Sequence, residues 1–206
     1  MGQSKFFAKI VFFTVLLFSA ILIDSFSSFS ANCDSIRENT LRLHILANSD
    51  SPKDQEIKLK VRDRILKESG NLFYFDDGIL NAKEKAKNNL TAIENIAKDE
   101  LAKLGVESDV SAELTNMFFD TRVYDSFTMP AGRYDALIIK IGKADGKNWW
   151  CVLYPQLCLP TASKNNEGIL NSVFTQDEVS ILESKPKYEI RFYAVEVFQK
   201  IKNKLS

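Results

Sequence analysis

The sequence is poor in the residues that most often build catalytic and metal centres. Its 206 residues contain one histidine, His44, and three cysteines. No two cysteines stand in the close Cys-x-x-Cys spacing that is typical of zinc sites. A glycine-rich phosphate loop and the Gly-x-Ser-x-Gly pattern of serine hydrolases are also missing. The sequence therefore offers no persuasive active site, and we expect no cofactor, no metal and no small-molecule substrate.

An excess of charge is lacking as well. The 27 basic and 27 acidic residues cancel, so nothing favours nucleic acid as a partner. Hydrophobic residues make up 45% and charged residues 26% of the chain, and 15 residues are Phe. This composition is typical of a globular domain with a core and not of a disordered chain.

The N-terminal segment, residues 1–30, differs from the rest. Lys5 and Lys9 precede the uncharged run IVFFTVLLFSAILI at residues 10–23. A basic start followed by an apolar run is typical of an export signal. The chain is therefore expected outside the cytoplasm, with membrane contact through this segment.

A serine-rich stretch follows the apolar run. Ser28 and Ser30 suit the small-residue positions of a cleavage site, which predicts a cut before Ala31. The sequence leaves open whether the segment is removed or kept as a membrane anchor. We expect residues 31–40 to be a short polar lead into the domain.

The remaining residues, 41–202, predict a single α+β domain. Alternating apolar residues indicate an N-terminal strand at 41–46, and apolar residues every three or four positions indicate two long amphipathic helices at 52–68 and about 79–104. Strand-like segments at 109–119, 133–142 and 148–158 predict an antiparallel β-meander. A short helix is expected at about 176–183. The C-terminal segment fits both a strand and a helical stripe, and we favour a helix that can follow a short strand. Gly70 and Gly105 are expected to end the two long helices.

The stretch LRLHILANSDSPKDQEIKLKVRDRIL, residues 41–66, raises the main functional question. Its turn from strand to helix lies close to His44, and the acidic residues Asp50 and Asp54 follow. One interpretation makes these three residues the centre of an exported hydrolase or metal-dependent enzyme.

The simpler interpretation of this stretch is structural, and we favour it. Ser51 suits an N-cap, Pro52 suits the first helical position and Asp54 suits the acidic position of a capping box. His44 would then be a partly buried histidine bonded to a neighbouring loop.

Residues 148–158, NWWCVLYPQLC, combine tryptophan and cysteine. Trp149 and Trp150 are adjacent, so they should point to opposite faces of a strand, and an exposed indole is a typical binding hot spot. In an exported protein Cys151 and Cys158 can form a disulfide if the chain turns back between them; two unpaired core cysteines are the alternative. Cys33 is left over and should be free or paired between molecules.

Three segments together resemble the stage II sporulation protein R family of endospore-forming Firmicutes. They are residues 41–66, residues 129–158 (MPAGRYDALIIKIGKADGKNWWCVLYPQLC) and the tail YEIRFYAVEVFQ. The resemblance covers about residues 40–199 and departs mildly at Gln156, where the family has a second proline.

The resemblance implies a signalling protein that is not itself an enzyme. Members of this family are made in the forespore and exported into the space between the two sporulation membranes. There they switch on a membrane-embedded aspartyl protease, which processes the pro-form of the mother-cell sigma factor, sigma-E. A weaker alternative is a membrane-anchored structural protein. Candidate partner-binding residues are His44, Asn48, Ser49, Asp50, Asp54, Gln55, Trp149 and Trp150.

Overall fold

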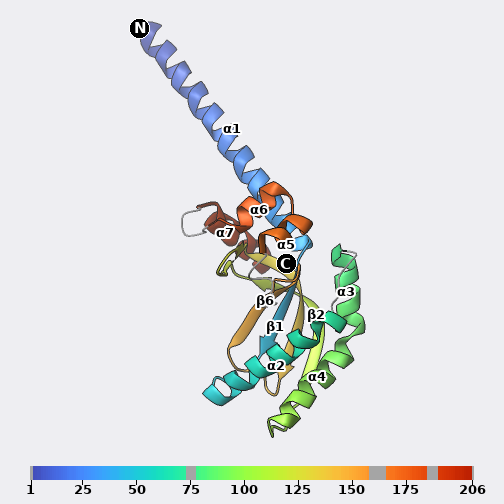
Figure 1. The fold of residues 1–206 in the computed structure, drawn as a ribbon. Coiled ribbons are helices and arrows are strands. Elements are labelled where there is room, and N and C mark those ends of the chain that lie inside the picture. The colour runs from blue at the N-terminus through green and yellow to red at the C-terminus, as the bar shows by residue number, and fades with distance from the viewer. Residues whose placement is uncertain (1, 73–77, 158–165, 185–189, 206) are drawn as a thin grey trace.

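The chain forms a mixed α+β fold, as expected, with a long N-terminal helix that projects from it (Figure 1). The computed structural model describes residues 2–72, 78–157, 166–184 and 190–205. In chain order the elements are α1 (Gly2–Glu38), β1 (Leu41–Leu46), α2 (Pro52–Leu72), α3 (Gly78–Asn88), α4 (Leu90–Lys103), β2 (Val110–Phe119), β3 (Arg122–Val123), β4 (Thr128–Met129), β5 (Gly132–Ile141), β6 (Asn148–Tyr154), α5 (Asn166–Val173), α6 (Gln176–Leu182) and α7 (Ile190–Leu205).

The main sheet has four strands in the order β2-β5-β1-β6. β2 and β5 pair antiparallel, as the meander predicted. β5 and β6 are not neighbours, however, because β1 lies between them, parallel to β5 and antiparallel to β6. The meander was therefore wrong at this step. The physical reason is burial: five of the six β1 residues are buried, on both faces, and only a central strand can be covered in this way.

The helix predicted at 79–104 is two helices. α3 ends at Asn88 and α4 begins at Leu90. Between them, the Asn89 side chain donates hydrogen bonds to the carbonyl oxygens of Lys85 (2.9 Å) and Leu72 (3.2 Å), which favours a break. Gly70 does not end α2, which continues to Leu72. The β3–β4 hairpin and α5 were not predicted.

The predicted helix caps are largely confirmed. α2 begins at Pro52, and the Asp54 N–H donates to the Ser51 hydroxyl at 3.1 Å. α6 has the complete capping box of Thr175 and Glu178. After α4, Gly105 takes φ +67°, a left-handed conformation that favours glycine at a helix end.

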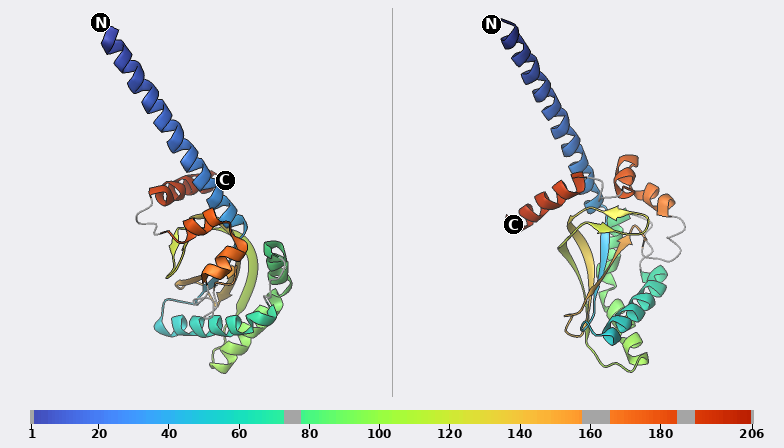
Figure 2. Two further views of the ribbon diagram at one scale, coloured as in Figure 1. Left: turned by 45° about the horizontal axis from the view of Figure 1, so that its top comes forward. Right: turned by 90° about the vertical axis from the view of Figure 1, so that its left-hand side faces the viewer.

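Two hydrophobic cores lie on the two faces of the sheet. α2 and α4 pack over one face, and α3 lies beside β2 (Figure 1). The lower end of α1, the β3–β4 hairpin, α6 and α7 cover part of the other face (Figure 2). The first core contains Leu41, Leu43, Ile45, Val61, Ile65, Ile93, Leu101, Leu137 and Ile139. The second contains Phe29, Cys33, Ile36, Phe119, Met129, Tyr134, Val152, Leu182, Phe192 and Val195.

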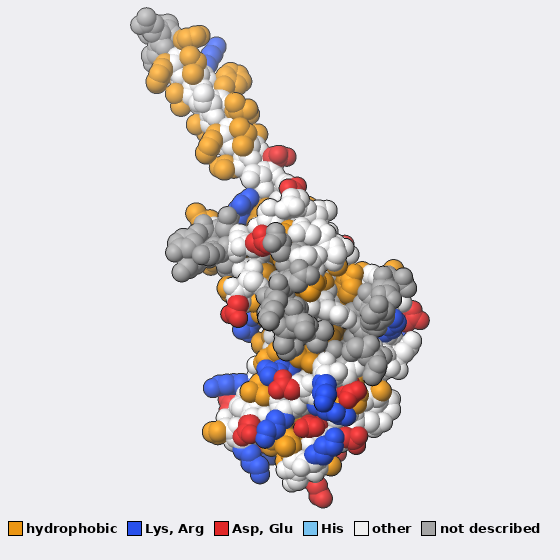
Figure 3. All heavy atoms as spheres, viewed as in Figure 1, with side chains coloured by type: hydrophobic (Ala, Val, Ile, Leu, Met, Phe, Trp, Pro, Cys, Tyr) orange, Lys and Arg blue, Asp and Glu red, His pale blue; other side chains and the backbone are white. Residues whose placement is uncertain are grey.

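α1 joins the predicted signal segment to the folded domain without a break. Its residues Phe6 to Ile23 are exposed and mostly apolar (Figure 3), and the helix is long and apolar enough to cross a membrane. Residues 31–38 continue the same helix, so the expected polar lead was wrong. Cys33 and Ile36, which are three residues apart and so lie on one side of the helix, face the second core and are fully buried. The bond between Ser30 and Ala31 therefore lies inside α1.

Replacing Ile36 by Ala tests whether this part of α1 belongs to the domain. The change leaves a cavity in the second core and should lower the free energy of unfolding by about 2–5 kcal/mol. Chemical denaturation of the full chain in a mild detergent would measure the loss. Phe18→Ala, on the exposed part of α1, is the control and should leave the stability of the domain unchanged.

Candidate functional site

The loop between β1 and α2 is held by its own side chains. Asp54 accepts hydrogen bonds from the Asn48 amide (2.9 Å) and the Ser49 hydroxyl (2.5 Å). The Gln55 amide donates to the Ser49 carbonyl at 2.9 Å. These bonds from Ser49, and then from Asn48, hold the pKa of the Asp54 carboxyl below its usual value of 3.8. Asp54 therefore helps to fold the loop, where the sequence suggested a capping box.

The same loop is tied to the connection between β5 and β6. The Lys147 N–H donates to Asp50 at 2.5 Å, and the Lys143 N–H donates to Asn48 at 3.1 Å. The contact is so close that a Cβ on Gly146 would lie 2.2 Å from the Ser49 carbonyl oxygen. Asn48, Ser49, Asp50, Asp54 and Gln55 thus have structural partners, and together they fix the far end of β1.

His44 lies on the opposite face of the sheet from Leu43 and Ile45 and is almost fully buried, with 3% of its surface exposed. Its ring stacks on Trp150, its partner on β6, with centroids 3.7 Å apart and planes at 17°. Burial lowers the His44 pKa from 6.5 to about 4, so the imidazole is neutral at pH 7. The Asn148 side chain, at the start of β6, opposes this shift, but neither ring nitrogen makes a hydrogen bond of normal geometry to a described residue, so the expected bond to a neighbouring loop is not found.

A buried cation, Arg42, lies one step along the same face. Its guanidinium is 4.5 Å from the centroid of the Phe119 ring and 5.1 Å from that of Tyr134. It donates to the Tyr124 hydroxyl at 2.7 Å and to the Cys151 carbonyl at 3.2 Å. No carboxylate pairs with Arg42 among the described residues, so aromatic faces and neutral oxygens compensate its charge.

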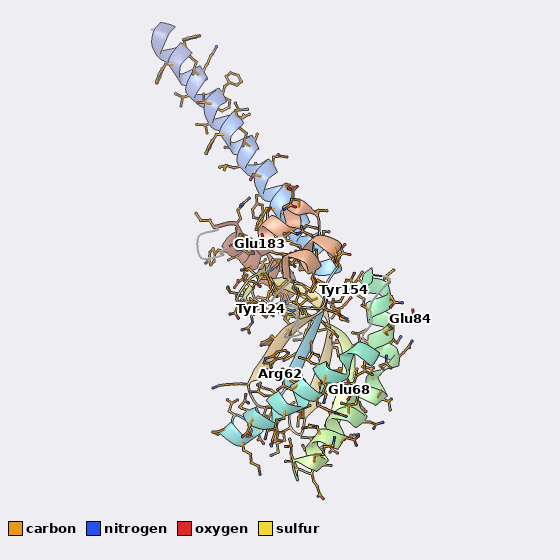
Figure 4. All side chains as sticks on the ribbon, viewed as in Figure 1. Arg62, Glu68, Glu84, Tyr124, Tyr154 and Glu183 are labelled. Carbon is orange, nitrogen blue, oxygen red and sulfur yellow. The ribbon has the colours of Figure 1, made fainter. Side chains whose placement is uncertain are left out.

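The two tryptophans point to opposite faces, as predicted, and both are partly exposed. Trp149 packs against the first core, and the Arg62 guanidinium of α2 lies 4.9 Å from its ring centroid. Trp150 lies on the second face, and the guanidinium of the exposed Arg122 is 5.4 Å from its ring centroid. Figure 4 shows Arg62 on α2 and Tyr124 near the other end of the sheet, well separated from it.

These residues lie at an edge of the sheet. β6 is the last strand in the order β2-β5-β1-β6, and no described strand pairs with its outer side. An edge strand is a place where a segment of another chain can add to a sheet. We refer to β6 with Trp149, Trp150, Arg62 and Arg122 as the tryptophan edge.

The structure does not bring the candidate enzyme residues together. His44 faces Trp150 and Phe119, whereas Asp50 and Asp54 bond within the loop beyond the end of β1. The charges that act on His44 come from Arg42, Arg122 and Lys140, all basic. Within the described ranges no group of three or more His, Cys, Asp or Glu residues is placed to hold a metal ion.

The cysteines are only partly described. Cys151 is buried, and Cys158 lies outside the described residues, so their disulfide stays a prediction. Cys33 is free and fully buried in the second core, where burial raises the pKa of its thiol to about 12.

Sequence reasoning missed Arg42, Arg122 and Arg62 as parts of this site. Arg42 alternates with apolar residues on a strand that is buried on both faces. This position was the only feature of the sequence that could have indicated a buried arginine. The two other arginines come from α2 and β3, and nothing in their local sequence indicates that they cover tryptophans.

Comparisons with known proteins agree on one family. A family model described as stage II sporulation protein R matches residues 37–164. The curated protein named stage II sporulation protein R of Bacillus subtilis (strain 168) is 32% identical, and the match covers 78% of this chain and 80% of that protein. No solved structure matches.

Replacing Ser51 by Ala removes the N-cap of α2. Loss of the hydrogen bond to the Asp54 N–H should lower the free energy of unfolding by about 1 kcal/mol. Urea denaturation would measure it, and Ser51→Asp, which can cap, should restore most of the loss. An unchanged free energy of unfolding would contradict this role of Ser51.

The buried His44 predicts a dependence of stability on pH. Between pH 6.5 and about 4 the unfolded chain binds a proton that folded His44 does not, so stability should fall as the pH falls through this window. His44→Phe keeps a ring against Trp150 and should lose this component. Asp54 acts separately below pH 3.8, since its pKa is lowered. Equal slopes in denaturation series of the two proteins between pH 4 and 6.5 would contradict the prediction.

Proposed function

Because the chain belongs to the stage II sporulation protein R family, we propose that it is an exported signal that binds a membrane-embedded sporulation aspartyl protease. Binding activates the protease, which then processes the pro-form of the mother-cell sigma factor, sigma-E. The observation that carries the proposal is the family match over residues 37–164, which includes the whole sheet and both tryptophans.

The N-terminal helix supports the proposed compartment. Lys5 and Lys9 precede the apolar part of α1, and the folded domain follows it. Basic residues favour the cytoplasmic side of a membrane, so the domain lies on the other side. This orientation supports the proposed location in the space between the two sporulation membranes of a forespore.

We place the protease contact at the tryptophan edge. Partly exposed aromatic and arginine side chains are the residues most enriched among binding hot spots. Arg122 is exposed and makes no ion pair to a described residue, so it is available to an acidic group of the partner. An extended segment of the protease paired along β6 would contact Trp149 on one face and Trp150 on the other.

The loop residues have a supporting part in this proposal. Asn48, Ser49 and Asp50 bind the connection that leads into β6, and so set where the tryptophan edge begins. Their replacement should act through the position of Trp149 and Trp150.

The alternative, an exported hydrolase or metal-dependent enzyme that uses His44, receives little support from the geometry. A general base needs an accessible ring nitrogen. The His44 ring is buried against Trp150 and separated from Asp50 and Asp54.

Substitutions at the tryptophan edge test the proposal. The full chain is expressed with the protease and the sigma precursor, and both co-purification and precursor processing are measured. Trp150→Ala and Arg122→Ala should each reduce both by about tenfold or more, as for a hot spot of roughly 2 kcal/mol. Leu80→Ala, at an exposed apolar residue of α3 on the other side of the sheet, is the matched control and should act like the parent.

His44→Phe separates binding from catalysis. It retains a ring that can stack on Trp150 and removes the imidazole, the acid–base group of residue 44. Processing of the precursor should therefore persist in a folded variant. Lost processing with normal co-purification would favour the enzyme. Normal processing by both Trp150→Ala and Arg122→Ala would move the contact away from the tryptophan edge.

A further inference from the structure

The outward face of α7 is apolar although it faces solvent. Its exposed large apolar side chains are Ile190, Tyr193, Val197, Phe198, Ile201 and Leu205, with exposed fractions from 38% to 85%. The opposite side of the helix packs on the domain through Phe192, Val195 and Gln199. A helix in a soluble domain usually turns its apolar side to the core and its charged side to water. α7 has apolar residues on both sides, and the outward ones lack a cover among the described residues.

Basic residues flank this outward face. α7 carries Arg191, Lys200, Lys202 and Lys204 against one acidic residue, Glu196. At 100° per residue, Arg191 and Lys202 fall on one flank of the apolar face, and Lys204 falls within the face near its other edge. Lys200, just beyond that edge, is paired with Glu196 (2.7 Å) and Asp120 (3.0 Å). An apolar face bordered by basic residues is typical of helices that lie in the plane of a membrane surface.

The first turn of α7 lies close to the end of the apolar part of α1. The Phe192 ring packs edge-to-face on Phe29 of α1 with centroids 5.3 Å apart. Arg191 lines the same hollow as Asp24, the first residue after the apolar run. Phe29 is six residues beyond Ile23, or about 9 Å along the helix. The N-terminal end of α7 therefore lies near the outer surface of a headgroup layer, which is about 5–8 Å deep.

The direction of α7 agrees with this position. It leaves the base of α1 to one side instead of following it (Figure 2). The sheet lies on one side of α7, and α1 projects on the other, so the face opposite the sheet looks toward the region into which α1 extends. The apolar part of α1, from Phe6 to Ile23, is about 27 Å long, close to the hydrocarbon thickness of a bilayer.

We propose that α7 is an interfacial helix that docks on the surface of an anionic lipid bilayer while α1 spans it. The apolar stripe enters the boundary between headgroups and acyl chains, and Arg191, Lys202 and Lys204 contact lipid phosphates. With two points of attachment, the domain is held at a fixed orientation to the membrane. This inference rests on the proposed insertion of α1 and adds a second contact to it.

Tryptophan quenching in vesicles tests the contact. The full chain is reconstituted into vesicles of phosphatidylcholine and phosphatidylglycerol whose acyl chains carry bromine. One tryptophan is added at a time, by Phe198→Trp on α7, Phe12→Trp on α1 or Leu59→Trp on α2, and the signal of Trp149 and Trp150 is subtracted with the parent protein. Phe198→Trp and Phe12→Trp should lose most of the added fluorescence. Leu59→Trp, on the part of the domain far from α1, should keep it.

A second variant excludes an effect of α1 alone. Ile201→Glu places a charge in the exposed stripe without touching the buried side of α7, so the fold should persist. It should abolish quenching in the Phe198→Trp chain and leave it unchanged in the Phe12→Trp chain. Quenching of Phe12→Trp without quenching of Phe198→Trp overturns the proposal and leaves the stripe to a protein partner or a second copy. Because the readout is lipid contact, a chain that fails to activate the protease can still pass this test.

Discussion

The fold depends on the burial of β1 on both faces. Leu41, Leu43 and Ile45 enter one core, and Arg42 and His44 enter the other. A strand with this pattern is stable only between two neighbours and under cover on each side. β5 and β6, which follow each other in the chain, therefore lie on either side of β1, and the connection between them has to cross its end. The bonds between residues 48–50 and 143–147 hold this crossing in place.

A polar row inside the second core follows from the same constraint. Arg42 is enclosed without a carboxylate, and its charge is met by the faces of Phe119 and Tyr134 and by two neutral oxygens. Each of these contacts is weaker than a paired carboxylate, but none has to be desolvated as a second charge. His44 remains neutral beside this cation. The result is a buried row of residues on which Trp150 packs.

Local signals in the sequence predicted the elements well. The cap at Ser51 and Pro52, the capping box at Thr175 and Glu178, and the opposite directions of Trp149 and Trp150 all depend on neighbours within a few residues. Strand order could not be predicted in this way, because the insertion of β1 joins segments about ninety residues apart. The coverage of the tryptophans by Arg62 and Arg122 was missed for the same reason. The break at Asn89 was missed because an amide bonded to Leu72 interrupts an otherwise regular apolar pattern.

The continuity of α1 has a consequence for the lifetime of the tether. The bond before Ala31 is helical, and Phe29, two residues before it, is locked in the second core. A protease acts on backbone that is locally opened, and opening here would have to pull Phe29 and Cys33 out of the core. For a peptidase that cuts at this bond, cutting and folding would compete, because the bond is open before the domain closes and is protected afterwards. Whether such a peptidase released the domain would then depend on which of the two events came first.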